Sequence, residues 1–430
     1  MNRRRLLQIL AGSGVVASMN ARHIVAQFGA APAPGVGLSQ TGMDLLQSPV
    51  IVTPEAMALH ERSLVFDGHN DLPWCLRKSY EGDWRKLDIS QPQPELQTDI
   101  PRLRAGGVGA LFWSAYVPAE TARRGTALQD TLDQIDCIHQ LVKRWPDTFE
   151  LSLTADDVER IHRSGKIASL IGIEGGHSIQ NSIGALRQLV GLGARYMTLT
   201  HSDTIDWADS ATDEPRHGGL TDFGEDVVRE MNRLGMLVDI SHVSRDTMLD
   251  ALRVSKAPVI ASHSGAKAVA DHPRNVPDDV LKVMADKGGV VMVNFFSGFV
   301  VPESALARKD MFDVRRRLTA EHPDPAEFAA AYKQWQDEHP ILRGTVRHVV
   351  DHIDHIVQVA GIDCVGLGSD FDGVAMTPEQ LDDVAGFPNI TQELLNRGYK
   401  ADAVQKVLGL NTLRVLRDAG RIASSTTTND

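Results

Sequence analysis

The sequence is poor in cysteine and has no excess of positive charge. Three cysteines in 430 residues exclude a small fold built on disulfides, and three cannot all pair with one another. Acidic residues outnumber basic residues by 56 to 44, which gives a formal net charge of −12. An acidic chain repels polyphosphate, so we expect no nucleic-acid partner. Charged residues at 23% and apolar residues at 42% exclude global disorder and collagen.

Long apolar runs are also missing, and the one near the N-terminus is too short to span a bilayer. A membrane-crossing helix needs about 20 apolar residues, whereas this stretch runs only from Ile9 to Met19. Arginines precede it, small residues follow it, and no cysteine offers a site for a lipid anchor. This order is typical of an export signal of the twin-arginine type, with a general secretion signal as the alternative. We therefore predict an export signal and linker over residues 1–37, a periplasmic protein and no stable membrane anchor.

Short runs rich in Val, Ile and Leu recur along the rest of the chain and alternate with helical patterns. Their continuous apolarity suits strands that are buried on both faces, as in parallel sheets. Eight such β-then-α units favour a (β/α)8 TIM barrel, with a doubly wound sheet as the alternative. The predicted strands are Leu64–Asp67, Ala110–Tyr116, Ala168–Ile173, Tyr196–Thr200, Leu237–Ile240, Val259–Ser262, Gly289–Asn294 and Cys364–Gly368.

A charged excursion separates the seventh and eighth predicted strands. It covers residues 302–340 and contains two helical-looking pieces that meet near His322 and Pro323. We predict a helical insertion there that lies on the surface or forms a lid. Because no internal repeat and no second domain can be recognised, we predict a single domain over residues 38–424 and a polar tail over residues 425–430.

Residues that can bind metal follow six of the predicted strands. In a barrel, the C-terminal ends of the strands meet at one rim, where functional groups gather. Burying many ionisable groups together is costly unless something compensates them, and imidazole nitrogens and carboxylate oxygens suit Zn²⁺. The sequence therefore predicts a metal centre at this rim. The segments are Asp67–Asp71, Ile173–His177, Thr198–His201, Asp239–His242, Ala261–Ser264 and Gly368–Gly373.

Five candidate ligands favour two ions over one, because a single catalytic zinc usually takes three protein ligands. His69, Asp71 and Glu174 form one predicted set, and Glu174, His242 and His263 form the other. Glu174 would then bridge the ions with one carboxylate oxygen on each. Two ions about 3.5–4 Å apart can share a hydroxide and lower the pKa of that water toward about 7.

These segments resemble the membrane dipeptidase family (renal dipeptidase, peptidase M19). The resemblance runs in order from about Leu64 to Leu416, and its motifs are far more specific together than any one alone. It implies a (β/α)8 barrel of the metal-dependent hydrolase type that holds two Zn²⁺ ions and hydrolyses the peptide bond of small dipeptides. A homodimer is implied by the resemblance only. The matching segments are Phe66–Pro73, Glu174–His177, Arg195–His201, Val238–His242, Ser262–Ser264, Pro273–Val276 and Gly366–Gly373.

The resemblance also implies roles for individual residues. Asp370, His201 and Glu174 are the expected catalytic residues. His201 would contact the substrate carbonyl and stabilise the oxyanion, and Asp370 would deliver a proton to the leaving amine. Arg274 would bind the terminal carboxylate, a pairing that a guanidinium makes with two hydrogen bonds, so His201, Arg274 and Asp370 are the expected substrate-binding residues. In the alternative for each residue, Arg274 forms a surface ion pair, Asp370 caps the following turn, and His201 contacts the metal ligands instead of the substrate.

One departure from the family pattern concerns Phe299. Vertebrate members have a tyrosine in this region that helps to hold the carboxylate, and a phenyl ring cannot donate a hydrogen bond. That contact is therefore not expected here, and substrate preference can differ accordingly.

Two other functions compete with a dipeptidase. A binuclear amidohydrolase could act on another amide, such as an N-acyl amino acid or a β-lactam. Several of those enzymes bridge their metals with a carbamylated lysine on the fourth strand, but Tyr196–His201 contains no lysine and Glu174 offers a bridge on the third strand instead. A binding protein without activity would be marked by the loss of a ligand, and all five predicted ligands are present.

Overall fold

The computed structural model describes residues 48–427, so the predicted export signal lies outside the described range. The residues from Val50 onward form one compact unit. Its nine strands all pair in parallel and follow the order β2-β1-β9-β8-β7-β6-β5-β4-β3, and β2 also pairs with β4. The β2–β4 pairing closes a barrel of eight strands, which confirms the predicted (β/α)8 fold. The strands are β1 (Val65–Asn70), β2 (Val108–Tyr116), β3 (Phe149–Leu151), β4 (Ile167–Glu174), β5 (Ala194–Thr198), β6 (Leu237–Asp239), β7 (Ile260–Ser264), β8 (Val290–Val293) and β9 (Val365–Leu367).

Strand β3 is additional to the eight strands of the closed ring, and it was not predicted from the sequence. It has only three residues, and it pairs with the first residues of β4, where Phe149 lies opposite Ile167. The last residues of β4 pair instead with β5, where Glu174 lies opposite Thr198. The segment is too short to show a hydrophobic period, and for that reason the sequence pattern does not reveal it.

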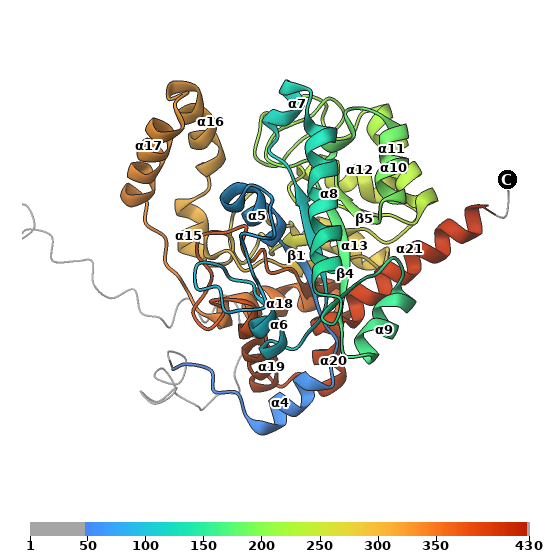
Figure 1. The fold of residues 1–430 in the computed structure, drawn as a ribbon, viewed down its shortest axis with the longest axis vertical. Helices are drawn as coiled ribbons and strands as arrows, with labels where there is room; N and C mark the ends of the chain where they lie inside the picture. The colour runs from blue at the N-terminus through green and yellow to red at the C-terminus, as the bar shows by residue number, and fades with distance from the viewer. Residues whose placement is uncertain (1–47, 428–430) are drawn as a thin grey trace, which may run out of the picture. The chain divides into compact units, whose positions relative to one another are not determined.

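Helices follow the strands and surround them (Figure 1). Helices α11 and α12 begin directly after Thr221 and Ser244, whose side chains accept backbone hydrogen bonds at the helix N-termini. No helix in the described part of the chain is long and apolar enough to cross a membrane. The helices are α4 (Pro54–Glu61), α5 (Leu72–Tyr80), α6 (Ile100–Ala105), α7 (Glu120–Arg124), α8 (Ala127–Arg144), α9 (Ala155–Arg163), α10 (Ile183–Gly191), α11 (Asp222–Leu234), α12 (Arg245–Val254), α13 (Asp278–Asp286), α14 (Ser297–Val300), α15 (Pro302–Ala307), α16 (Met311–Glu321), α17 (Pro325–Glu338), α18 (Val346–Ala360), α19 (Phe387–Asn396), α20 (Ala401–Gln405) and α21 (Asn411–Thr427).

Alternate side chains of the strands belong to two different buried clusters. Phe66, Phe112, Tyr196 and Met292 lie in one cluster, while their strand neighbours belong to the larger cluster that includes the surrounding helices. The first cluster therefore fills the inside of the ring. Gly172 makes room in it, because a Cβ at that position would lie 2.1 Å from the ring of Tyr196.

The predicted insertion between the last two barrel strands is present and consists of three helices rather than two. The short helix α15 precedes α16 and α17, and the break between these two falls at residues 322–324, where the sequence predicted it. Helices α16 and α17 lie side by side as a hairpin, drawn in orange (Figure 1). Val314, Leu318 and Trp335 form a small buried cluster that holds the hairpin together.

Candidate active site

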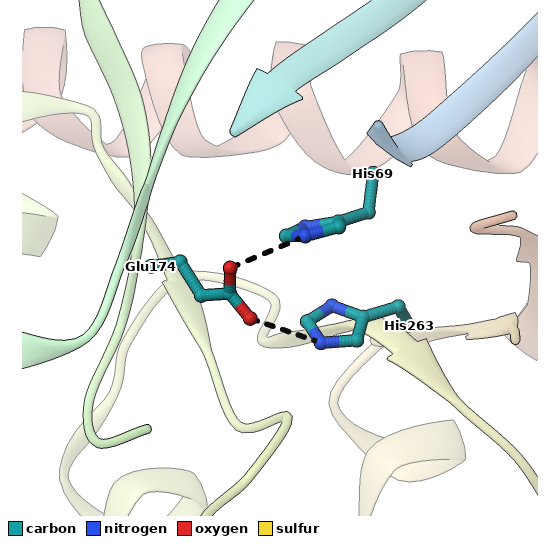
Figure 2. Close-up of side chains that lie close together, drawn as sticks. All are labelled: His69, Glu174 and His263. Carbon is teal, nitrogen blue, oxygen red and sulfur yellow. Dashed lines mark ion pairs between the residues drawn. The ribbon is translucent and has the colours of Figure 1, made fainter. Parts of the chain in front are cut away.

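Glu174 lies at the centre of the site, at the C-terminal end of β4. Its side chain is buried, and its two carboxylate oxygens face different imidazoles. Oε2 lies 3.4 Å from Nε2 of His69, and Oε1 lies 3.1 Å from Nε2 of His242 and 3.5 Å from Nε2 of His263. Figure 2 shows the carboxylate between His69 and His263, with one oxygen toward each ring. This arrangement is the one that a carboxylate bridging two ions requires.

His69 and Asp71 come from the end of β1 and from the residue just after it. Nε2 of His69 lies 3.2 Å from Oδ2 of Asp71, and both side chains are buried. The other ring nitrogen, Nδ1, lies 2.7 Å from the hydroxyl oxygen of Tyr196. With its proton on Nδ1, His69 donates a hydrogen bond to the hydroxyl oxygen of Tyr196. The lone pair on Nε2 then faces the carboxylates of Asp71 and Glu174 and is free to bind a cation.

His242 lies three residues after β6, His263 lies in β7, and both face Glu174. Their Nε2 atoms lie 2.9 Å apart. Ser262 Oγ donates to Oδ2 of Asp239 at 2.7 Å, so it accepts from Nδ1 of His263 at 2.8 Å. That hydrogen bond fixes the proton of His263 on Nδ1 and leaves a lone pair on Nε2.

This geometry fits a metal site. Nε2 of His242 and Nε2 of His263 lie 2.9 Å apart and face the same carboxylate oxygen, so a cation placed between them would be ligated by all three groups. Oδ1 of Asp71 is buried and has no hydrogen-bond partner among the described residues, and a buried oxygen without a partner is unusual. The structure therefore brings all five predicted ligands together, with donor atoms that suit zinc.

The charges of this cluster shift the pKa values of its members. Burial opposes ionisation of Glu174, but the charge of His69 and hydrogen bonds from the histidines outweigh it and hold its pKa well below the usual range. Burial lowers the pKa of His69, but the nearby Tyr196, Asp71 and Glu174 raise it well above the usual value. Because a metal ligand must be a neutral imidazole, binding of a cation must displace a proton from His69.

His201 follows β5 and lies at the edge of the cluster. Its Nε2 is 3.7 Å from Oε1 of Glu174, and its ring stacks beside those of His242 and Tyr116, with ring centroids 4.3 and 4.8 Å away. Burial lowers its pKa to about 4, so the ring is neutral at pH 7 and can donate a hydrogen bond without carrying charge. It is near enough to Glu174 and His242 to ligate the same cation, so its place allows a contact to substrate or to metal.

Asp370 follows β9 and turns its carboxylate toward the site. Oδ2 accepts a hydrogen bond from Nδ2 of Asn294 at 2.7 Å, and its backbone has a φ of 65°. A left-handed φ at a residue other than glycine is strained, and such strain is concentrated at functional sites. Burial raises its pKa to about 8, and the charges of Asp71 and Glu174 add to this shift. A cation bound to those two carboxylates would cancel their contribution and lower the pKa again.

Arg274 lies beneath the same cavity and is only 1% exposed. Nη2 donates to the backbone oxygen of His263 at 3.2 Å, and Nε has no partner among the residues that the structure covers. Burial lowers its pKa to about 10, so it remains charged, yet it forms no ion pair within residues 48–427. The guanidinium carbon lies 5.4 Å from the centre of the Phe299 ring, which has no hydrogen-bonding group. A buried cation without a counter-ion is suited to receive an anionic group of a ligand.

A cavity of about 480 Å³ opens above these residues. Asp71, Glu174, His201, Arg274 and Asp370 line its floor, and the helical insertion lines the other side. Sequence reasoning missed several of its walls. Tyr116 could have been found, because it ends a predicted strand and strand ends meet at the rim of the site. The sequence contains no signal that places residues of the insertion over the site. The missed residues include Trp74, Lys78, Tyr116, Phe296, Phe312, Arg315 and Phe328.

Comparisons with known proteins agree with one another. The family model described as membrane dipeptidase (peptidase family M19) matches residues 53–430. Dipeptidase verJ of Clonostachys rogersoniana is 40% identical over 362 residues, which cover 82% of this chain and 83% of that protein. Dipeptidase tcpJ of Claviceps purpurea (strain 20.1) is 40% identical over 369 residues, covering 84% and 78%. The crystal structure of the probable dipeptidase PvdM from Pseudomonas aeruginosa matches with a TM-score of 0.74 at 25% identity, covering 86% of this chain and 98% of that one.

Proposed function

The chain belongs to the membrane dipeptidase family, peptidase family M19, and is a peptide-bond hydrolase. From this premise we propose that it binds two zinc ions and cleaves small dipeptides with a hydroxide that the ions share. The observation that carries the proposal is the position of Glu174, whose two carboxylate oxygens face His69 on one side and His242 and His263 on the other. When bound, two zinc ions supply Lewis acidity and a hydroxide at neutral pH.

The residues of the chain itself orient the substrate. Arg274 binds the terminal carboxylate of the dipeptide, because it is a buried cation with an Nε that has no partner among the described residues. Its contact with the Phe299 ring holds the guanidinium plane without competing for the carboxylate. A cavity of about 480 Å³ has room for a dipeptide. We infer that the requirement for a free carboxylate close to the scissile bond restricts the enzyme to short peptides.

Two further side chains act on the reacting groups. The neutral His201 donates a hydrogen bond to the carbonyl oxygen, and this bond strengthens as negative charge develops there. Asp370 delivers a proton to the leaving amine, and its hydrogen bond from Asn294 fixes the carboxylate in place. Its left-handed backbone turns the side chain back across the end of β9 toward His69 and Asp71.

The proposal is tested with a panel of substrates and a measurement of metal content. The purified protein, loaded with zinc, is assayed on Ala-Ala, Ala-Ala amide, N-acetylalanine and a β-lactam, and the zinc per chain is measured by plasma mass spectrometry. We expect two ions per chain, hydrolysis of Ala-Ala and a much slower reaction of the amide, which lacks the carboxylate for Arg274. Hydrolysis of the N-acyl amino acid or the β-lactam without hydrolysis of Ala-Ala would favour the amidohydrolase alternative.

We also propose that the protein is exported to the periplasm by the twin-arginine route. The support is the sequence pattern of the first 37 residues, with arginines ahead of a short apolar stretch. Replacing Arg4 and Arg5 by lysine in the full chain should keep the protein in the cytoplasm. Unchanged export of that variant would contradict the twin-arginine assignment.

A further inference from the structure

The cavity above the site continues beneath the helical insertion. A second cavity of about 600 Å³ adjoins the one of about 480 Å³, and the two share walls. Tyr116 and His201 contribute from the barrel rim, and Phe312, Arg315 and Phe328 contribute from α16 and α17. The two cavities together therefore extend beyond the immediate surroundings of Glu174, and side chains of the insertion line their outer part.

Arg315 is a cation in this shared wall that has no ion-pair partner in the described part of the chain. Its side chain is exposed to the cavity and forms no ion pair or hydrogen bond with any other residue in the range 48–427. The next residue differs, because Arg316 contacts Asp213 and Asp313. Lys78 in α5 lines the catalytic cavity as well and also has no ion-pair partner in the described part of the chain.

The acidic groups of the cavity do not neutralise these cations. Asp71, Glu174 and Asp370 are the acids of the catalytic cavity, and all of them belong to the candidate metal site. Glu120 and Asp203 border the outer cavity, but neither forms an ion pair with Arg315 in the described structure, and Asp203 is paired with Arg123. With Arg274 at the floor, the catalytic cavity thus presents three cations that form no ion pair within residues 48–427, in a chain whose net charge is −12. Concentrating positive charge in a pocket of an acidic protein favours anionic ligands.

We propose that Arg315, assisted by Lys78, determines specificity by binding a second carboxylate, so that the preferred substrates are dipeptides with an acidic side chain. The inference rests on the proposed dipeptidase function, in which Arg274 takes the terminal carboxylate. A guanidinium recognises a carboxylate with two parallel hydrogen bonds, and no residue between 48 and 427 occupies those donors of Arg315. Phe312 and Phe328 line the same two cavities as Arg315, so apolar surface is also available there to the rest of the side chain.

The test compares each acidic dipeptide with its neutral isostere. The value of kcat/KM is measured with the zinc-loaded full chain for Ala-Glu against Ala-Gln and for Glu-Ala against Gln-Ala, which also reveals the position of the acidic residue. We expect the acid to be preferred in at least one pair by about tenfold, the discrimination that corresponds to about 1.4 kcal/mol. The preference should shrink as salt is added, because an exposed charge contact is screened, whereas a preference based on shape should not.

Three variants of helix α16 separate the role of Arg315 from a general effect of charge. Arg315→Gln should bring the acid-to-amide ratio close to one, and Arg315→Lys should retain part of the preference. Arg317→Gln is the matched control, because this substitution removes the same charge from the same helix and Arg317 lines neither cavity. Its ratio should equal that of the wild type.

The outcomes distinguish this inference from the proposed function. Hydrolysis of the dipeptides without an acid preference, or the same preference in Arg315→Gln as in the wild type, would overturn the role of Arg315 and leave the dipeptidase function standing. A preference for neutral side chains that depends on Phe312 or Phe328 would overturn it in the same way. Failure to hydrolyse any of the four dipeptides would overturn the proposed function and, with it, the inference.

Discussion

The hydroxyl of Tyr196 holds His69 in the orientation that ligation requires, so Tyr196→Phe should weaken metal binding and leave the fold intact. Tyr196 is fully buried, with its hydroxyl oxygen 2.7 Å from Nδ1 of His69. Phenylalanine keeps the ring, which packs beside Phe112 with the ring centroids 4.7 Å apart. The variant leaves a buried N–H without an acceptor, which costs about 1–3 kcal/mol. This corresponds to a loss of about 10–100-fold in metal affinity, the usual effect of removing such a supporting contact.

The assay titrates the metal-free protein with zinc in competition with a chromophoric chelator. Tyr399→Phe is the matched control, because it removes a hydroxyl that donates to Oδ1 of Asp354 at the same distance of 2.7 Å but does not line the cavity above the site. Thermal unfolding of both metal-free variants checks that they fold. Wild-type affinity in Tyr196→Phe, or an equal loss of affinity in Tyr399→Phe, would refute the reasoning.

Two further predictions follow from the same geometry. Ser262→Ala removes the acceptor for Nδ1 of His263, so zinc affinity should fall by about tenfold in the same titration, and an unchanged affinity would mean that Ser262 does not orient the ring. Because Asp71 and Glu174 raise the pKa of His69 well above its usual value, zinc binding at pH 7 should release a proton and apparent affinity should increase with pH. Calorimetry in two buffers of different ionisation enthalpy measures that release, and a value of zero would contradict it.

Much of the barrel could be predicted because its strands are buried on both faces. The run Ala168–Ile173 is mostly apolar and carries no charge, and the corresponding strand β4 is buried along its whole length. Helix α11 has local signals at both ends, because Thr221 is a good N-cap and Gly235, with a φ of 71°, ends the helix. The strand β3 could not be predicted, because three residues are too few to show a hydrophobic period and only the structure reveals that they pair with β4.

The ligands could be proposed from the sequence for a topological reason. Each of them lies at or just after the C-terminal end of a strand, and the parallel strands of a barrel place these ends at one rim. The residues that support the ligands could not be proposed in this way. Tyr196 reaches His69 because Gly172 lies opposite it in the pairing of β4 with β5 and leaves space for the ring. That space depends on the register of two strands, which the sequence of either strand does not specify.

The cations of the outer cavity were beyond sequence reasoning for a different reason. Arg315 lies in a surface helix whose pattern is that of a solvated face, with Arg316 and Arg317 beside it. Which of the three arginines faces the cavity depends on how the hairpin of α16 and α17 sits over the barrel. Long-range packing of this kind has no local signature in the chain.

The most direct test of the central claim measures zinc content and dipeptide turnover in Glu174→Gln. Glutamine keeps the shape of the side chain but replaces one carboxylate oxygen with an NH₂ group, which donates hydrogen bonds and cannot bridge two cations. Glu61→Gln is the control, because Glu61 is an exposed acid at the end of α4. The account predicts that Glu174→Gln binds fewer than two zinc ions per chain and loses turnover, while Glu61→Gln behaves as the wild type. Full turnover with two bound ions in Glu174→Gln would contradict the bridging role.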